Sequence, residues 1–187
     1  FYFSPMIPLR KIETSPGRVG RMLDRVVVAL FAVAAALLLA NLDNGLLWQD
    51  EAETAVLARH VLRFGYPRAT DGLSVIEIHP YHNGPGEAWL YSPWLPFYLL
   101  AGVFALFGES TWTARLPFAL CGLMSVVLTW RLAAAVTPRR SIQRLSVALL
   151  VCSVPFLLHM RQCRYYAMTT ALVLAVCLGY AGLLRRP

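Results

Sequence analysis

The sequence has few charged residues and no closely spaced pair of cysteines, and both absences restrict the class of protein to which it can belong. Only 14% of its 187 residues are charged, whereas an ordinary soluble domain carries about 25%. Apolar residues make up 58%, and the mean hydropathy is +0.56. A disordered chain is therefore excluded, and a soluble globular domain is disfavoured. The four cysteines form no Cys-x-x-Cys pair and lie in or beside apolar runs, which argues against a zinc site or a disulfide framework.

Five apolar runs stand out, and their lengths decide which of them can cross a membrane. They are 26–42, 94–107, 116–136, 145–160 and 165–184. A spanning helix needs about 20 apolar residues. The third and fifth runs are long enough. We expect 46–48 to extend the first, and Ile142 and Gln143 to lengthen the fourth. The second run, with 14 residues, has the length of an interfacial or re-entrant helix.

Positive charge sets the expected orientation. If the second run does not span, one side of the membrane holds 11 of the 17 Lys and Arg residues and two of the ten acids. The positive-inside rule makes that side cytoplasmic. We therefore predict an all-α integral membrane protein with about four transmembrane helices. Residues 1–25 form a cytoplasmic basic segment, and 26–187 form a transmembrane domain with interfacial helices in an outer loop at about 43–113.

The outer loop begins with an acidic cluster. Its sequence is Trp48-Gln49-Asp50-Glu51-Ala52-Glu53. The segment that follows is patterned as a short amphipathic helix, which we expect to lie on the membrane surface with Leu57, Val61 and Phe64 on its apolar face. Two interpretations of the acids stay open. Asp50 is a helix N-cap with Glu53 completing a capping box, or Asp50 is a general base at the membrane interface, with Glu51 orienting a substrate hydroxyl or a cation.

A second charged cluster lies at 159–166, between the fourth and fifth runs and on the expected outer side. Arg161 and Arg164 are three residues apart, so a helix would place them on one face, where paired guanidinium groups bind phosphate. The alternative is that both arginines extend to lipid headgroups. Tyr165 and Tyr166 suit an interfacial belt or an aromatic wall for a sugar or prenyl chain. His159 is a further candidate, as the partner of a carboxylate or phosphate.

Metal binding has a weak signal. His79 and His82, with Glu87 nearby, have the side chains that a metal site uses. The stretch is rich in Pro and Gly, so helical spacing does not apply and an ordinary polar loop is favoured. The sequence indicates no cofactor with certainty, and a divalent metal is the one left open.

Four segments together resemble a known family. They are Trp48-Gln49-Asp50-Glu51-Ala52, Ser92-Pro93-Trp94-Leu95-Pro96, Ala114-Arg115-Leu116-Pro117 and Arg161-Gln162-Cys163-Arg164-Tyr165-Tyr166. In this order and spacing they resemble bacterial membrane glycosyltransferases of the GT-C fold, the protein mannosyltransferase and aminoarabinose transferase relatives. The resemblance covers about 47–184.

The resemblance implies a reaction. A sugar passes from a polyprenyl-phosphate carrier to an acceptor hydroxyl on the outer face of the membrane, with inversion at the anomeric carbon. Asp50, with Glu51 beside it, matches the proposed base of the family, and Arg161 matches a ligand of the donor phosphate. The resemblance also implies a multi-pass protein of the bacterial inner membrane with a periplasmic active side. Some relatives carry a second acid where this chain has Tyr165 and Tyr166.

The ends of the sequence favour a piece of a larger protein. The chain begins with Phe1 and stops where an apolar run stops. The alternative function is therefore a truncated, non-catalytic membrane fragment or accessory protein with the same scaffold. A transporter is disfavoured, because no charge lies at mid-depth in a run. The expected partners are the lipid bilayer and a polyprenyl-phosphate-linked sugar; the acceptor is unknown, and nucleic acid is not expected.

Overall fold

The computed structural model describes residues 24–73, 76 and 83–184, and this part of the chain is helical without any strand. The elements are α1 (Arg25–Leu39), α2 (Gln49–Phe64), η1 (Pro85–Glu87), α3 (Leu95–Phe107), α4 (Thr111–Val136), α5 (Arg140–Val151), α6 (Val154–Met160) and α7 (Tyr166–Leu183). The predicted fold class is confirmed: this is an all-α membrane protein. The basic segment at 1–25 lies outside the described residues, except for its last two.

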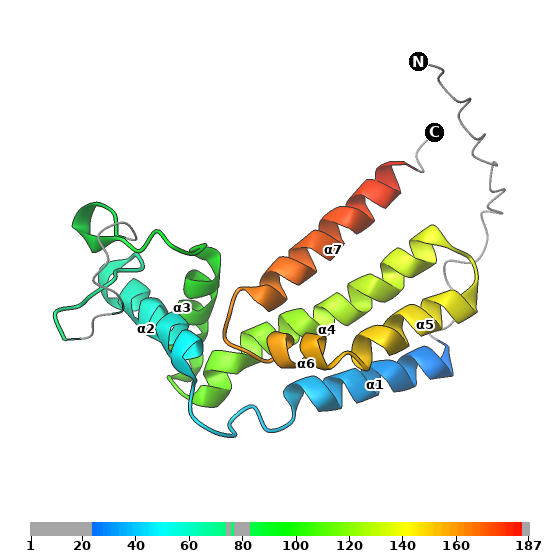
Figure 1. Ribbon diagram of the computed structural model, residues 1–187, viewed down its shortest axis with the longest axis horizontal. Coiled ribbons are helices and arrows are strands. Elements are labelled where there is room, and N and C mark those ends of the chain that lie inside the picture. The colour runs from blue at the N-terminus through cyan, green and yellow to red at the C-terminus, as the bar shows by residue number, and fades with distance from the viewer. Residues whose placement is uncertain (1–23, 74–75, 77–82, 185–187) are drawn as a thin grey trace, which may run out of the picture.

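The helix α4 is the centre of a bundle, in contact with α1, α5 and α7. The helices α1 and α5 run opposite to α4, and α7 runs in the same direction (Figure 1). The start of α1, the turn between α4 and α5 and the end of α7 therefore lie at one end of the bundle, and α2 and α3 lie at the other. The charge pattern of the sequence predicts that the first three of these segments share one side of the membrane.

Among the described residues, two helices, α4 with 26 residues and α7 with 18, are long and apolar enough to cross a membrane, fewer than the four or so that the sequence predicts. The helices α5 and α6 are long enough for a third span only when they are taken together, and this pair bends by 63° at the break between them. There Ser153 caps α6 by accepting from the backbone N–H of Phe156. Ile142 and Gln143 do lengthen α5, as predicted.

The first apolar run is shorter than predicted. Its helix, α1, has 15 residues, which at 1.5 Å per residue is about 22 Å, against about 30 Å for a hydrocarbon core. The expected extension through 46–48 is wrong, because α1 ends at Leu39 and Leu46 is exposed outside any helix.

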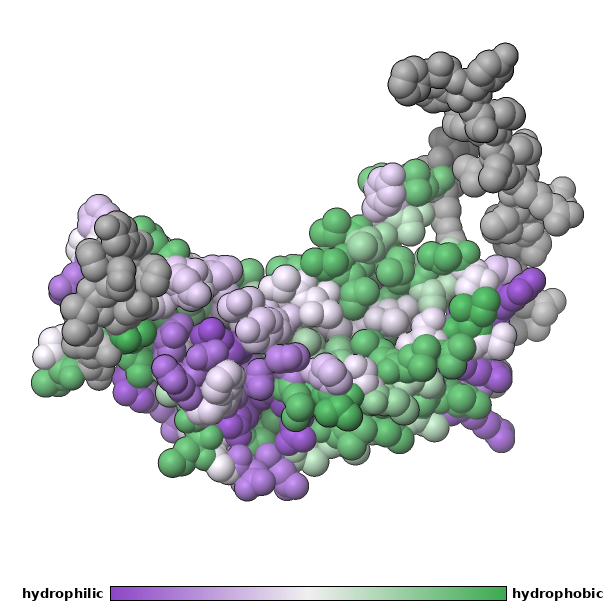
Figure 2. Space-filling model, in the orientation of Figure 1, coloured by the Kyte–Doolittle hydropathy of each residue, from purple (hydrophilic) through white to green (hydrophobic). Residues whose placement is uncertain are grey.

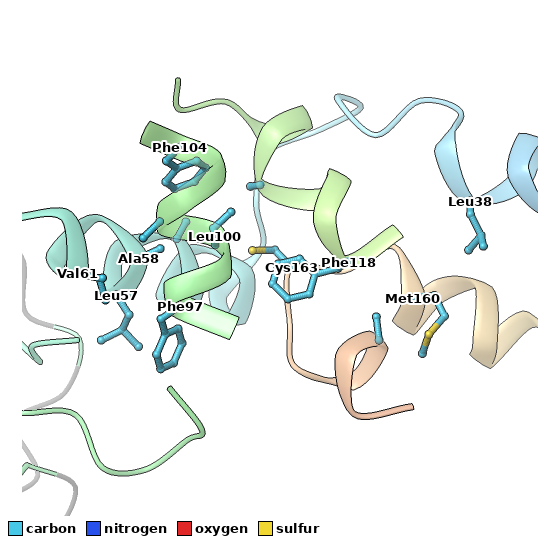
Figure 3. Packing of buried hydrophobic residues seen from close by; sticks show 14 of the residues in the cluster. Leu38, Leu57, Ala58, Val61, Phe97, Leu100, Phe104, Phe118, Met160 and Cys163 are labelled. Atoms are coloured by element: carbon cyan, nitrogen blue, oxygen red, sulfur yellow. The ribbon is translucent and has the colours of Figure 1, made fainter. Parts of the chain in front are cut away.

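The second apolar run forms α3, which lies beside α2 at one end of the bundle and also contacts α4 (Figure 1). Its 13 residues are too few to span. Its buried residues Phe97, Leu100 and Phe104 belong to the same apolar cluster as Leu57 and Val61 of α2 (Figure 3). The apolar face of α2, predicted to rest on the membrane surface, is therefore covered by α3.

An ion pair joins the amino ends of α1 and α5. Asp24 caps α1 by accepting from the backbone N–H of Val26 at 3.1 Å, and Arg144 Nε donates to Asp24 Oδ2 at 2.7 Å. The capping hydrogen bond first, and then Arg144, lower the pKa of the Asp24 carboxyl. A lowered folded-state pKa gives stability that is present above the unfolded pKa of about 3.9 and is lost as pH falls through the folded value.

We therefore expect Asp24→Asn to lower the thermal unfolding midpoint in detergent at pH 7. The difference from the wild type should shrink as pH falls below about 4, because the wild-type carboxylate is then protonated as well. Asp43→Asn, which changes an exposed acid on the loop after α1, is the control. A difference between Asp24→Asn and wild type that stays constant from pH 7 to pH 3 contradicts the assignment.

Candidate functional site

The acidic cluster forms the first turn of α2, where carboxylates suit the positive end of the helix dipole. The N-cap is Trp48, whose backbone N–H donates to Glu51 Oε2 at 3.4 Å. The interpretation of Asp50 as the N-cap, with Glu53 completing a capping box, is therefore wrong: Trp48 is the N-cap and Glu51 is the residue that completes the box. The helix ends at Gly65, which adopts a left-handed backbone with φ 83°.

Glu51 is the buried member of the cluster, only 1% exposed. Arg115, in the first turns of α4, donates from Nε to Glu51 Oε1 at 2.9 Å and from Nη2 to Oε2 at 2.7 Å. The backbone N–H of Cys163 also donates to Oε1, at 2.9 Å. The same guanidinium donates to three carbonyls of the segment between α1 and α2, those of Leu42, Asn44 and Leu46. Both oxygens of Glu51 therefore serve to join α2 to α4 and to the segment before α7.

Asp50 is the most open of the three acids. Its side chain is 35% exposed, against 21% for Glu53. Arg164, itself 8% exposed, lies behind it: Nη2 is 3.4 Å from Asp50 Oδ2, and Nη1 is 3.1 Å from Glu53 Oε1. The buried Nε of Arg164 has no hydrogen-bond partner in the described part of the chain. The structure thus brings together Asp50 and Arg164, which are 114 residues apart.

Arg161 has different partners. It donates to the carbonyls of Leu37, Ala40 and Asn41 at 3.1, 2.5 and 3.2 Å, at the carboxyl end of α1. A cation is favoured at that end of a helix dipole. The prediction that Arg161 and Arg164 share a helix face is wrong, because α6 ends at Met160 and α7 begins at Tyr166.

Three aromatic rings gather beside Arg164. The ring centroids of Tyr165 and Tyr166 are 4.6 Å apart, and those of His159 and Tyr166 are 5.1 Å apart. The guanidinium of Arg164 lies 5.6 Å from the centre of the Tyr165 ring. A hydrogen bond with Tyr166 and partial burial raise the pKa of the Tyr165 hydroxyl. His159 Nδ1 lies 3.2 Å from Gln162 Oε1.

The candidate metal ligands do not come together in the described residues. Glu87 accepts from Arg68, with 2.7 Å between Arg68 Nη2 and Glu87 Oε2, and His79 and His82 lie outside the described part. Within it, no group of three or more His, Cys, Asp and Glu side chains could hold a metal. Burial, and then the charge of Glu51, raise the pKa of the Cys163 thiol, so this thiol stays protonated.

Arg115 belongs to the site, although the sequence analysis does not predict it. Its position just before a long apolar run could have indicated that it lies at the membrane surface with a partner. Figure 2 shows hydrophilic residues gathered at this end of the molecule, beside the mostly hydrophobic bundle. A buried acid needs a cation close by, and Arg115 pairs with Glu51 at 2.7 Å.

These features define an all-helical membrane protein with a cluster of ion pairs at one end of its bundle. A family model, dolichyl-phosphate-mannose-protein mannosyltransferase, matches residues 91–185. The chain belongs to this family, as its sequence resemblance indicates. The family is one of membrane glycosyltransferases with lipid-linked sugar donors. No curated protein and no solved structure matches the chain. The matched range contains Arg115, Arg161 and Arg164, and Asp50 and Glu51 precede it.

Proposed function

We propose that the protein transfers a sugar from a polyprenyl-phosphate carrier to an acceptor hydroxyl, with inversion at the anomeric carbon, and that Asp50 is the general base. The observation that carries this proposal is the unequal exposure of neighbouring acids. Asp50 is partly open and lies against the buried Arg164, whereas Glu51 is enclosed by protein donors. An open carboxylate held in place by a buried cation is oriented to accept a proton from a bound hydroxyl.

The chemistry follows from that placement. Asp50 removes the proton from the acceptor hydroxyl as the hydroxyl oxygen attacks the anomeric carbon. The bond between that carbon and the phosphate oxygen breaks, and polyprenyl phosphate leaves with the electron pair. The growing negative charge on the phosphate requires cationic donors. Arg164 and Arg161 are the proposed donors, and Tyr165, Tyr166 and His159 are proposed to line the path of the sugar or prenyl chain.

The unpartnered Nε of Arg164 supports its role toward phosphate. A buried N–H group without an acceptor costs about 1–3 kcal/mol. A phosphate oxygen would recover that energy once a movement of the side chain exposes this nitrogen, which is enclosed in the present structure. Glu51 has a different part in this proposal. Because its oxygens are bonded to Arg115 and Cys163, it positions the first turn of α2 and leaves the proton transfer to Asp50.

We propose a location on the outer face of a bacterial inner membrane. The supporting observation is charge: the opposite end of the bundle carries Arg139, Arg140 and Arg144 near the turn between α4 and α5, and basic residues favour the cytoplasmic side. The ion-pair cluster then faces outward.

A non-catalytic membrane fragment or accessory protein is the second candidate. The observation that favours it is the use of Arg161 and Glu51 for bonds within the scaffold. A protein that kept only the scaffold would need those bonds and no substrate.

The test is a transfer assay with the full-length protein in proteoliposomes. We expect label to pass to acceptor from a radiolabelled polyprenyl-phosphate sugar and not from the matching nucleotide sugar. The product should carry the inverted anomeric configuration by NMR. A retained configuration, or use of the nucleotide sugar, would contradict the proposal. Correct insertion with no transfer from a panel of lipid-linked sugars would favour the accessory protein.

A further inference from the structure

A groove lies at the end of the bundle away from the ion-pair cluster. It has a volume of about 250 Å³ and lies between the last turns of α4 and the first turns of α5, with Leu132, Ala133, Val136, Ile142 and Ser146 among its lining residues. The hydroxyl of Ser146 donates to the carbonyl of Ile142 at 2.9 Å. The groove therefore presents mainly carbon atoms, in a region where both helices are expected to contact lipid.

Two exposed arginines border this groove. Arg139 and Arg140 lie in the chain between the groove residues Thr137 and Ile142. Neither has a carboxylate at ion-pair distance within the described part of the chain, but Arg140 is close enough to Asp24 to help lower the pKa of that carboxyl. The third arginine of the region, Arg144, is already paired with Asp24. Two exposed arginines thus lie in the chain between residues that line the apolar groove.

The amino end of α5 adds to the positive potential. No side chain caps this helix, and its first turn contains no acid. The first backbone N–H groups of a helix lack intrahelical acceptors, and the helix dipole makes this end favourable for an anion. Asp24 already pairs with Arg144 near this end of α5, and a phosphate next to Arg139 and Arg140 would add a second negative charge.

We propose that this groove binds one anionic phospholipid, with an acyl chain against Leu132, Ala133 and Val136 and the phosphate at Arg139, Arg140 and the amino end of α5. An apolar groove with two exposed arginines beside it matches a ligand with a hydrocarbon chain and a negatively charged head. The inference does not depend on the proposed transferase reaction, since the groove and the ion-pair cluster lie at opposite ends of the bundle (Figure 1).

The test is photo-crosslinking of the full chain in nanodiscs of phosphatidylcholine. The probe is phosphatidylglycerol with a diazirine in one acyl chain, and mass spectrometry maps the labelled peptides. We expect label in 129–146, which excess unlabelled phosphatidylglycerol removes and which inorganic phosphate does not. Arg139→Gln with Arg140→Gln should reduce this label roughly tenfold, because each basic residue near a membrane surface adds appreciably to anionic lipid binding.

Two further variants separate the charge from the groove. Arg59→Gln with Arg63→Gln removes the same charge from two exposed residues of α2 and should leave the label unchanged. Ala133→Phe keeps every arginine but fills the groove, so the label should fall. Equal labelling by diazirine phosphatidylcholine, or full labelling of the Arg139 and Arg140 variant, would overturn the proposal. So would an absence of label in 129–146, which would mean that another segment or chain covers the groove.

Discussion

Asp50→Asn is expected to abolish detectable sugar transfer by the full-length protein while leaving its membrane insertion unchanged. Asparagine has nearly the same shape as aspartate, but its amide accepts no proton at neutral pH. Removing a general base typically costs about 10²–10⁴-fold in rate. The loss should fall on kcat, with little change in KM for the lipid-linked donor, because Asp50 acts on the acceptor hydroxyl.

The matched control is Glu109→Gln, the same acid-to-amide change at an exposed ion pair with Arg59. It lies at the same end of the molecule but takes no part in the proposed reaction, so it should transfer sugar at the wild-type rate. Protease protection of reporter-tagged proteins would check insertion of both variants. Transfer by Asp50→Asn at more than about a tenth of the wild-type rate would remove Asp50 from the role of general base.

The sequence indicated the helices well where apolar length was unambiguous, and less well at their ends. The run at 26–42 is apolar enough to continue, yet the chain turns at Asn41 and Gly45, which have φ of 52° and 75°. Asn and Gly tolerate the left-handed region that other residues avoid. Asn41 and Gly45 are turn formers that the sequence displays, but a prediction from the number of apolar residues alone does not take them into account.

The break between α5 and α6 has a similar origin. Ser153 and Pro155 lie inside the apolar run 145–160, and hydropathy alone does not predict an interruption there. In the structure Ser153 caps a new helix and Pro155 occupies its first turn, where the missing N–H of proline costs nothing. Local capping chemistry, and not hydropathy, decides where this pair of helices bends.

The site was harder to predict because burial of the acids depends on distant segments. Asp50 and Glu51 are neighbours, but successive side chains of a helix point about 100° apart, so one can be enclosed while the other stays open. The pattern of α2 alone does not reveal which one is enclosed. The choice is made by Arg115 and Cys163, which lie 64 and 112 residues away in the sequence.

Arg115→Met should destabilise the protein strongly, by about 3–5 kcal/mol, because it leaves the carboxylate of Glu51 buried without its cation. Denaturant unfolding in mixed micelles would measure the change. Arg59→Met is the control, since it breaks the exposed Arg59–Glu109 pair and should cost about 1 kcal/mol or less. Equal losses of unfolding free energy in the two variants would show that the buried ion pair stabilises the protein no more than the exposed one.

A double-mutant cycle identifies the cause of that loss. If the cost of Arg115→Met comes from the unpaired charge of Glu51, adding Glu51→Gln should restore part of the stability. A double variant as unstable as the sum of the two single variants would instead mean that Arg115 acts through its bonds to the carbonyls of Leu42, Asn44 and Leu46.

The same variants separate positioning from proton transfer. Arg115→Met should lose stability and kcat together, because α2 carries Asp50 and is released from α4, whereas Asp50→Asn should lose kcat at near-wild-type stability. Arg115→Lys keeps the charge but lacks the bidentate geometry, so it should recover part of both. A kcat that falls for Arg115→Lys with no loss of stability would mean that Arg115 acts on the substrate directly, and the positioning role would have to be given up.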